Sequence, residues 1–368
     1  MKVGILTFHN AHNYGAVLQA YALKKTIVRL GHDAVIVNYR NPIIDKKYSE
    51  KLSLDSQLLF YLPPWRWWKL FRNLLRNYYT RDTWVIQCKK FNDFITKYLL
   101  DGNTEIIFRN NIDSIGCDAL ISGSDQIWSK WITGTLDSVY FLDIQTEARK
   151  IAYAPSISNP ELVNTDKKYF KHTLTQYYRL STREESLSKI ISEITEKKVV
   201  TVLDPTLLLN VDEYKYLESS HLISDNFVFA YFVTEDKILK KCADYVSRKL
   251  NVKLIELHYY NQKSFDKTTQ KSDIGPEEFL EYINKSKFVL TNSFHGTILS
   301  ILYHKEFYSV YHSDSRKSNL LLKFGLEHRH IMSIDQINLT NMIDYTSVDK
   351  ILSAERQMSL DYLQEALS

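Results

Sequence analysis

Short apolar runs alternate with longer amphipathic stretches from the first residues of the chain. Residues 2–8 form an apolar run, and residues 15–30 carry apolar side chains at helical spacing up to Gly31. A second apolar run covers residues 34–37. This pattern predicts a strand, a helix and a strand, which open a Rossmann-like unit with a parallel sheet. The unit lacks the GxGxxG sequence, which disfavours a dinucleotide ligand.

The alternation resumes after a long interruption. Residues 41–115 are expected to form a helical, irregular insertion. Further buried strands are predicted at residues 118–121, 151–154, 199–202, 227–233, 252–256 and 287–290. We therefore predict an α/β fold with two Rossmann-like domains, residues 1–205 and 206–345. Residues 346–368 should form a C-terminal helix that packs back on the N-terminal domain, and the cleft between the domains is the expected ligand site.

One strand-to-helix junction in the second domain carries the most chemistry. The run 287–290 leads into Thr-Asn-Ser-Phe-His-Gly-Thr, residues 291–297, and an apolar, helix-length stretch follows. At such a junction a helix N-terminus offers N–H groups and a partial positive charge to a phosphate or carboxylate. Gly296 allows close backbone approach, and His295 adds a ring that titrates near neutral pH. A capping or core role for His295 is the alternative.

Composition narrows the range of functions. Of the 368 residues, 44% are hydrophobic and 24% charged, as in globular proteins, and a net charge of +4 is too small to indicate nucleic-acid binding. Cysteines without a CxxC pair argue against a zinc ribbon. His9 and His12 lack a third ligand at useful spacing, so neither a metal nor a cofactor is expected. No run approaches the ~20 apolar residues that span a bilayer, and we expect a cytoplasmic protein.

Six motifs occur in one order along the chain, at residues 13–23, 122–128, 153–156, 183–186, 203–206 and 293–297. They read NYGAVLQAYAL, SGSDQIW, YAPS, REES, LDPT and SFHGT. With these motifs the chain resembles the polysaccharide pyruvyl transferase family. The resemblance implies a fold similar to the GT-B glycosyltransferases, with the active site in the interdomain cleft. It also implies phosphoenolpyruvate as the donor. The acceptor would be a sugar of a cell-surface polysaccharide or of its polyprenyl-diphosphate-linked precursor, on which a pyruvate ketal forms.

Ketal formation requires protonation of the vinyl carbon, attack by a sugar hydroxyl and departure of phosphate. These steps call for cations, N–H donors and a proton shuttle. His295 is the expected acid/base or phosphate-binding residue. Arg183 stands at a motif that the family associates with donor binding, and an ion pair with Glu184 or Glu185 is its alternative role.

The donor site departs from the family pattern at one position. Many members carry an arginine two residues before the central histidine, where this chain has Ser293. We expect Arg316, with Lys317, to replace that contact, because both follow the strand next to the central motif. An ion pair between Arg316 and Asp314 is the alternative. Ser293 and Gly296 stay among the expected donor-binding residues.

Polar residues at strand ends of the first domain are the expected acceptor site. Asp125 could orient or deprotonate a sugar hydroxyl, and Gln126 follows it; capping a helix is the alternative for Asp125. Asn13 and Tyr14 precede the first helix, where they could bind a sugar or simply cap the helix.

Two other functions remain open on the sequence. One is a nucleotide-sugar glycosyltransferase of the same fold, and the other is a non-catalytic glycan-binding protein. Residues 65–81 combine basic and aromatic side chains without an acidic residue. They predict an amphipathic helix that contacts the inner face of the cell membrane, with a core-facing helix as the alternative.

Overall fold

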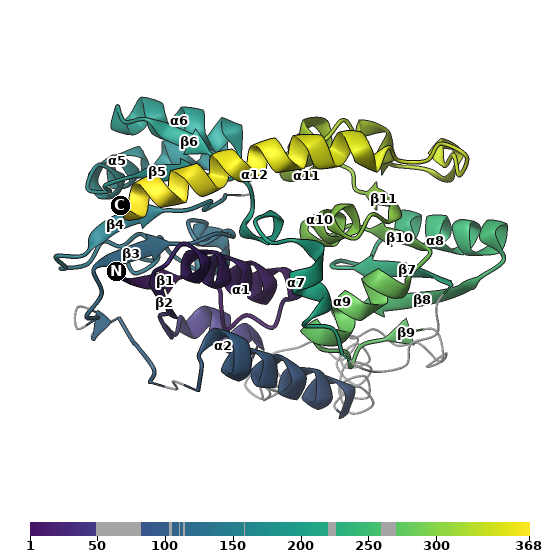
Figure 1. Ribbon diagram of the computed structural model, residues 1–368, viewed down its shortest axis with the longest axis horizontal. Coiled ribbons are helices and arrows are strands. Elements are labelled where there is room, and N and C mark those ends of the chain that lie inside the picture. The colour runs from purple at the N-terminus through teal and green to yellow at the C-terminus, as the bar shows by residue number, and fades with distance from the viewer. Residues whose placement is uncertain are drawn as a thin grey trace, which may run out of the picture.

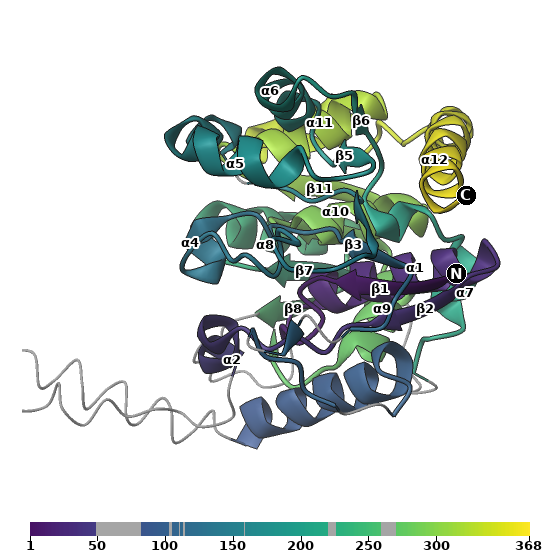
Figure 2. The ribbon, with the colours of Figure 1, turned by 90° about the vertical axis from the view of Figure 1, so that its left-hand side faces the viewer.

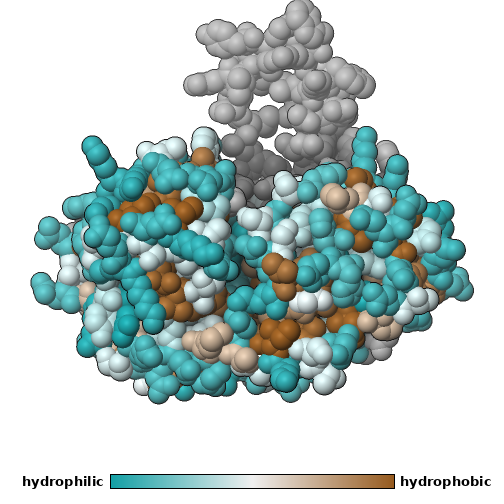
Figure 3. Space-filling view, turned by 90° about the horizontal axis from the view of Figure 1, so that it is seen from above, coloured by the Kyte–Doolittle hydropathy of each residue, from teal (hydrophilic) through white to brown (hydrophobic). Residues whose placement is uncertain are grey.

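The chain folds into two α/β halves that lie side by side, with one long helix running along both (Figure 1). The computed structural model describes residues 1–48, 82–102, 105–109, 111–112, 115–157, 159–219, 226–258 and 270–368. Seen from above, its surface is mostly hydrophilic, with apolar residues in separate patches (Figure 3).

The first half is built on a parallel sheet with the strand order β2-β1-β3-β4. Its strands are β1 (Lys2–Leu6), β2 (Asp33–Ile36), β3 (Ala119–Ser122) and β4 (Arg149–Ala152). A separate parallel pair, β5 (Leu180–Thr182) and β6 (Val199–Thr201), lies beyond β4. A bridge between Ile151 and Arg179 connects the two sheets. The helices of this half are α1 (Tyr14–Arg29), α2 (Pro42–Tyr48), α4 (Lys130–Thr133), α5 (Lys167–Leu174) and α6 (Glu185–Thr195).

The second half is built on a parallel sheet with the strand order β12-β11-β10-β7-β8-β9. Its strands are β7 (Phe227–Phe232), β8 (Lys253–His258), β9 (Gln270–Lys271), β10 (Phe288–Thr291), β11 (Glu306–Val310) and β12 (His330–Ile331). Its helices are α7 (Val211–Lys215), α8 (Lys237–Leu250), α9 (Pro276–Lys285), α10 (Phe294–Leu302) and α11 (Ser315–Lys323). Every residue of β7 and β10 is buried, as expected for parallel strands covered by helices on both faces.

Helix α1 lies where the two halves meet. Asn13 caps its first turn, and its residues from Tyr14 to Lys24 are all buried. A helix that is buried all round must pack against partners on every side. Tyr14 stacks on Phe279 of α9 with 4.3 Å between ring centroids, and the hydrophobic core that contains both rings draws residues from both halves. Apolar packing around α1 therefore fixes the two halves against each other.

The final helix, α12 (Tyr345–Leu367), runs back along the first half. Ser359 accepts a hydrogen bond from the Leu203 N–H at 3.0 Å, and the Tyr362 hydroxyl donates to the Ala152 carbonyl at 2.8 Å. As a result both chain termini lie close together on the first half (Figures 1 and 2).

The predicted fold class is confirmed, because two Rossmann-like halves with parallel sheets face each other in the GT-B arrangement. The insertion at 41–115 contains α2 and a helix at residues 82–94 that continues into a π-helical turn, Ile95–Leu99. Residues 65–81, for which a membrane contact is predicted, lie outside the described residues. Within the described ranges no helix is long and apolar enough to cross a membrane.

Candidate active site

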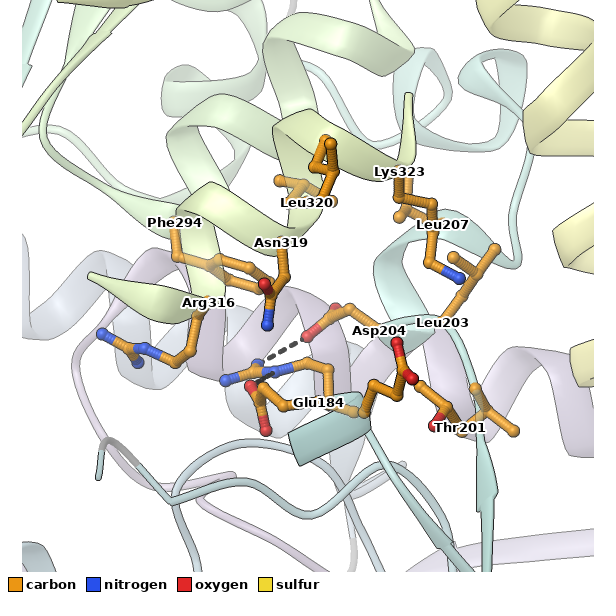
Figure 4. Close-up of a pocket in the computed structure, with 14 residues that line it drawn as sticks. Glu184, Thr201, Leu203, Asp204, Leu207, Phe294, Arg316, Asn319, Leu320 and Lys323 are labelled. Carbon is orange, nitrogen blue, oxygen red and sulfur yellow. Dashed lines mark hydrogen bonds and ion pairs between the residues drawn. The ribbon is translucent and has the colours of Figure 1, made fainter. Parts of the chain in front are cut away.

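Two neighbouring pockets open between the halves, and both are lined by Phe294 and Arg316. The histidine pocket, about 210 Å³, is also lined by Asn13, Asp125 and His295. The larger arginine pocket measures about 520 Å³. Its walls come from the β5–β6 region, with Arg183, Glu184 and Asp204, and from α11, with Asn319 and Leu320 (Figure 4). Most of the sequence-predicted residues thus meet in one cleft.

The turn between β10 and α10 fixes the start of the central helix. Ser293 is the N-cap of α10, and its hydroxyl accepts from the Gly296 N–H at 3.1 Å. The Thr291 hydroxyl accepts from the Ser293 N–H at 2.9 Å. A side chain at position 296 would bring a Cβ within 2.7 Å of the Thr291 hydroxyl oxygen, so glycine is needed there. This tight turn places Phe294 and His295 in the first helical turn, facing the cleft.

The ring of His295 packs against helix α1 of the first half. A Cβ at Gly15 would lie only 2.0 Å from Nδ1 of His295, so the ring occupies the space where α1 lacks a side chain. The other ring nitrogen, Nε2, lies 3.4 Å from Oδ2 of Asp204. Nε2 is buried and makes no hydrogen bond to any described residue, so this contact lacks hydrogen-bond geometry in the present conformation.

Asp204 joins the histidine to the arginine. Its Oδ2 accepts a hydrogen bond from Arg183 at 2.8 Å, and its Oδ1 accepts from the Thr206 N–H and hydroxyl at 3.0 and 2.6 Å. Burial raises the pKa of the Asp204 carboxyl, but the charges of His295 and Arg183 and the bonds from Thr206 hold it well below its usual value. The side chain is therefore an ionised carboxylate inside the protein.

Each of the three guanidinium nitrogens of Arg183 donates a hydrogen bond within the protein. Arg183 donates from Nε to Glu184 at 2.9 Å, from Nη1 to Asp204 and from Nη2 to the Ser156 hydroxyl at 2.8 Å. Burial lowers the pKa of Arg183, but Glu184 and Asp204 more than offset this and raise it above its ordinary value. The guanidinium also lies over the Phe294 ring, 4.4 Å from its centroid. The ion pair with Glu184, the alternative role of Arg183, is present.

Arg316 and Lys317 of α11 have different surroundings. Arg316 donates to both oxygens of Asp314, at 3.1 and 2.9 Å, and lines both pockets. Lys317 is buried, lines neither pocket, and donates to the Asn292 carbonyl at 2.8 Å. Burial lowers the pKa of Lys317 to about 8. The expectation that Lys317 binds the donor is corrected, because its ammonium group supports the β10–α10 turn instead.

The polar residues of the first half reach the histidine pocket, with one exception. Asp125, Gln126 and Asn13 all line it. Asp125 has a positive φ of 74° and accepts from the Gln126 N–H at 2.8 Å, and the N-cap of the next helix is Ser129. Tyr14 is the exception.

The tyrosine is a core residue. Its side chain has no exposed surface, and its hydroxyl donates to the Ile274 carbonyl at 2.9 Å and accepts from Gln87 at 3.0 Å. The predicted acceptor contact of Tyr14 is corrected by this position. The residue instead packs the two halves together.

Several residues of the site were not predicted to act there. Gly15, Ser156 and Asp204 all lie in the quoted motifs, and Phe294 precedes the central histidine. Asp204-Pro205-Thr206 has the pattern of a turn in which an aspartate caps its own backbone, and the bond from the Thr206 N–H shows that cap. Nothing in this local pattern reveals that the second carboxylate oxygen reaches Arg183 and His295.

Together, the parallel sheets and the cleft define a two-domain α/β protein of the GT-B architecture. A family model described as polysaccharide pyruvyl transferase matches residues 13–314, and the chain belongs to that family of transferases.

Several solved structures are similar to this chain at low identity. The UDP-GlcNAc 2-epimerase of Methanocaldococcus jannaschii is 11% identical with a TM-score of 0.48, over 97% of this chain and 94% of that chain. The Neisseria meningitidis UDP-GlcNAc 2-epimerase is 9% identical with a TM-score of 0.49, over 98% and 94%. UGT89C1 of Arabidopsis thaliana is 14% identical with a TM-score of 0.41, over 99% and 92%. A comparison with curated protein sequences gave no match.

Gly15→Ala should displace His295, because the new Cβ overlaps the ring. A shift of about 1 Å at a reacting group can lower turnover by about 100-fold. We expect a loss of that order in steady-state transferase assays, with the variant still folded by circular dichroism. Gly116→Ala is the matched control, since a Cβ at Gly116 meets no atom within 4 Å. Full turnover by Gly15→Ala would contradict the observed seating of the ring.

Proposed function

We propose that this protein transfers the pyruvyl group of phosphoenolpyruvate to hydroxyls of a cell-surface polysaccharide sugar, or of its polyprenyl-diphosphate-linked precursor, and forms a pyruvate ketal. The observation that carries the proposal is the position of His295 at the N-terminus of α10, in one pocket with Arg316 and Asp125. A proton donor, a cation and a carboxylate are the groups that this reaction uses. A peripheral membrane contact through residues 65–81 remains part of the proposal.

The histidine pocket supplies groups that suit the anionic donor. The N–H groups of Phe294 and His295 have no hydrogen-bond acceptor among the described residues, and both lie in the first turn of α10. Such groups bind phosphate or carboxylate well. Arg316 adds a guanidinium whose Nη1 has no partner in the described ranges, although Nε and Nη2 are bonded to Asp314. The pair with Asp314 therefore orients Arg316 and leaves it one face for the donor.

The remaining side chains fit the later steps of the reaction. His295 gives a proton to the terminal vinyl carbon, and a sugar hydroxyl forms a C–O bond to the adjacent carbon while Asp125 accepts the hydroxyl proton. The C–O bond to phosphate then breaks, and a second sugar hydroxyl closes the ketal ring and loses its proton to the departing phosphate. The balance is one phosphoenolpyruvate and one diol consumed, with one ketal and one inorganic phosphate released.

Arg183 has a supporting role in this proposal. All three nitrogens of its fork are bonded within the protein, to Glu184, Asp204 and Ser156. A direct grip on the donor, which the family resemblance implies, requires Arg183 to exchange one of its two carboxylates for the donor's carboxylate. In the present conformation it orders Asp204 and the Phe294 ring.

Phosphoenolpyruvate should stabilise the protein against heat, because a ligand that binds only the native state raises its stability. At about 100 times Kd the gain is about 2.7 kcal/mol, which shifts Tm by several degrees. Thermal-shift measurements with phosphoenolpyruvate and with a panel of UDP-sugars test this. Stabilisation by UDP-sugars alone would contradict the proposal and favour a nucleotide-sugar glycosyltransferase.

Arg316→Ala should raise the Kd for phosphoenolpyruvate at least about tenfold, the scale of one charged hydrogen bond. Isothermal titration calorimetry measures this without an acceptor. Lys253→Ala is the matched control, because it removes one positive charge at the amino end of β8, the opposite end of the sheet from the site. Unchanged affinity in Arg316→Ala would remove this arginine from the donor site.

A further inference from the structure

Asp204 is the point at which the two pockets are connected through side chains. It lies between β6 and the 3-10 turn Pro205–Leu207, and its side chain is 1% exposed. The residue lines the arginine pocket (Figure 4). His295, which it faces, lines the histidine pocket. The carboxylate of Asp204 contacts Arg183 from the first half and His295 from the second. The Asp204 side chain thus contacts both Arg183 and His295.

We propose that Asp204 is a positioning residue that holds Nε2 of His295, so that Nδ1 is the nitrogen that exchanges a proton with the substrate. The identity of the substrate rests on the proposed function. The orientation and tautomer of the His295 ring do not depend on the proposed function.

The two nitrogens of His295 have different surroundings. Nε2 is buried without a hydrogen bond to any described residue, and Oδ2 of Asp204 lies 3.4 Å away. At Nδ1 the neighbouring position is Gly15, and any side chain there would overlap that edge of the ring. Nδ1, unlike Nε2, is not among the fully buried polar atoms that lack a partner in the described residues, and His295 lines the histidine pocket. Hydrogen bonds of catalytic groups are often long before substrate binds, and a small closure of the cleft would bring Nε2 into bonding distance of Asp204.

The buried charges next to the ring do not cancel. Arg183 is bonded to two carboxylates, Glu184 and Asp204, so the buried group carries one negative charge in excess. Asp204 presents this excess charge to Nε2 of His295.

The other carboxylates of the histidine pocket, Asp314 and Asp125, are turned away from the ring toward partners of their own. Asp314 is paired with Arg316, while Asp125 is half-buried and turned toward its own backbone. Asp204 is thus the carboxylate in closest contact with the ring among the ion pairs of the described residues.

This arrangement suits proton delivery to a vinyl carbon. The Nδ1–H bond breaks, the new C–H bond uses the electron pair of the C=C bond, and the ring is left neutral with its hydrogen on Nε2. That neutral form is the tautomer whose N–H points at Asp204. The carboxylate therefore stabilises the ring both before and after the proton leaves. A buried aspartate holds the catalytic histidine in one tautomer in the same way in other enzymes.

Nitrogen NMR of the full chain with labelled histidine tests the assignment. The signals of His295 are identified by their absence in His295→Gln. In the wild type the neutral ring should carry its proton on Nε2. In Asp204→Asn the ratio of the two tautomers should change at least about tenfold, the equivalent of one charged hydrogen bond.

Glu184→Gln is the matched control. It removes the other carboxylate of Arg183 without touching the ring, so the His295 signals should not change. Unchanged His295 signals in Asp204→Asn would overturn the proposal and leave Asp204 as a partner of Arg183 only.

Thr206→Val decides the matter if Asp204→Asn does not fold. It removes the hydroxyl that donates to Oδ1 of Asp204 and should move the His295 signals in the same direction by a smaller amount. Signals that do not move would overturn the proposal. Failure of the proposed function is distinguishable, because phosphoenolpyruvate would then not bind while the ring still responds to Asp204.

Discussion

The ion pair between Arg183 and Asp204, 2.8 Å long and almost completely buried, is the interaction on which the cleft depends. Burying two charges costs several kcal/mol per ion unless their hydrogen-bonding capacity is satisfied. Here every arm of the guanidinium is bonded, and Thr206 satisfies the outer oxygen of Asp204. Removing Arg183 would leave the carboxylates of Glu184 and Asp204 uncompensated in the interior. The pair therefore holds the ends of β5 and β6 together at the arginine pocket.

The position of His295 follows from a second constraint, the close approach of α10 to α1. Apolar packing around Tyr14 fixes the two halves, and Gly15 provides the space in which the imidazole sits. The tight turn capped by Ser293 then directs the ring at Asp204. The fold thus determines the geometry of the site, since the residues that join the two halves also fix the position of His295, the residue proposed to transfer the proton. A cleft built from two rigid halves can hold such a geometry within the small tolerance that catalysis requires.

The sequence predicts the parts of this picture that depend on local patterns. The strand, capped turn and helix around His295 can be predicted because each has its own short-range signal, and the alternation of strands and helices predicts the two halves. Contacts over long sequence separations could not be predicted. Asp204 and Arg183 are separated by a helix and a strand, and Lys317 reaches back to the Asn292 carbonyl. Tyr14 looks like an exposed residue before a helix, but the second half covers it.

Transfer of labelled pyruvate tests the central claim most directly. The wild-type protein and His295→Gln are incubated in heavy water with phosphoenolpyruvate carrying carbon-13 at its vinyl terminus and with the glycan fraction of the source cells. The account predicts a labelled ketal methyl group with one deuterium, an equal amount of inorganic phosphate, and a rate at least about 100-fold lower in His295→Gln. Ketal formation at the wild-type rate in His295→Gln, or a glycan modified while phosphoenolpyruvate is left intact, would contradict it.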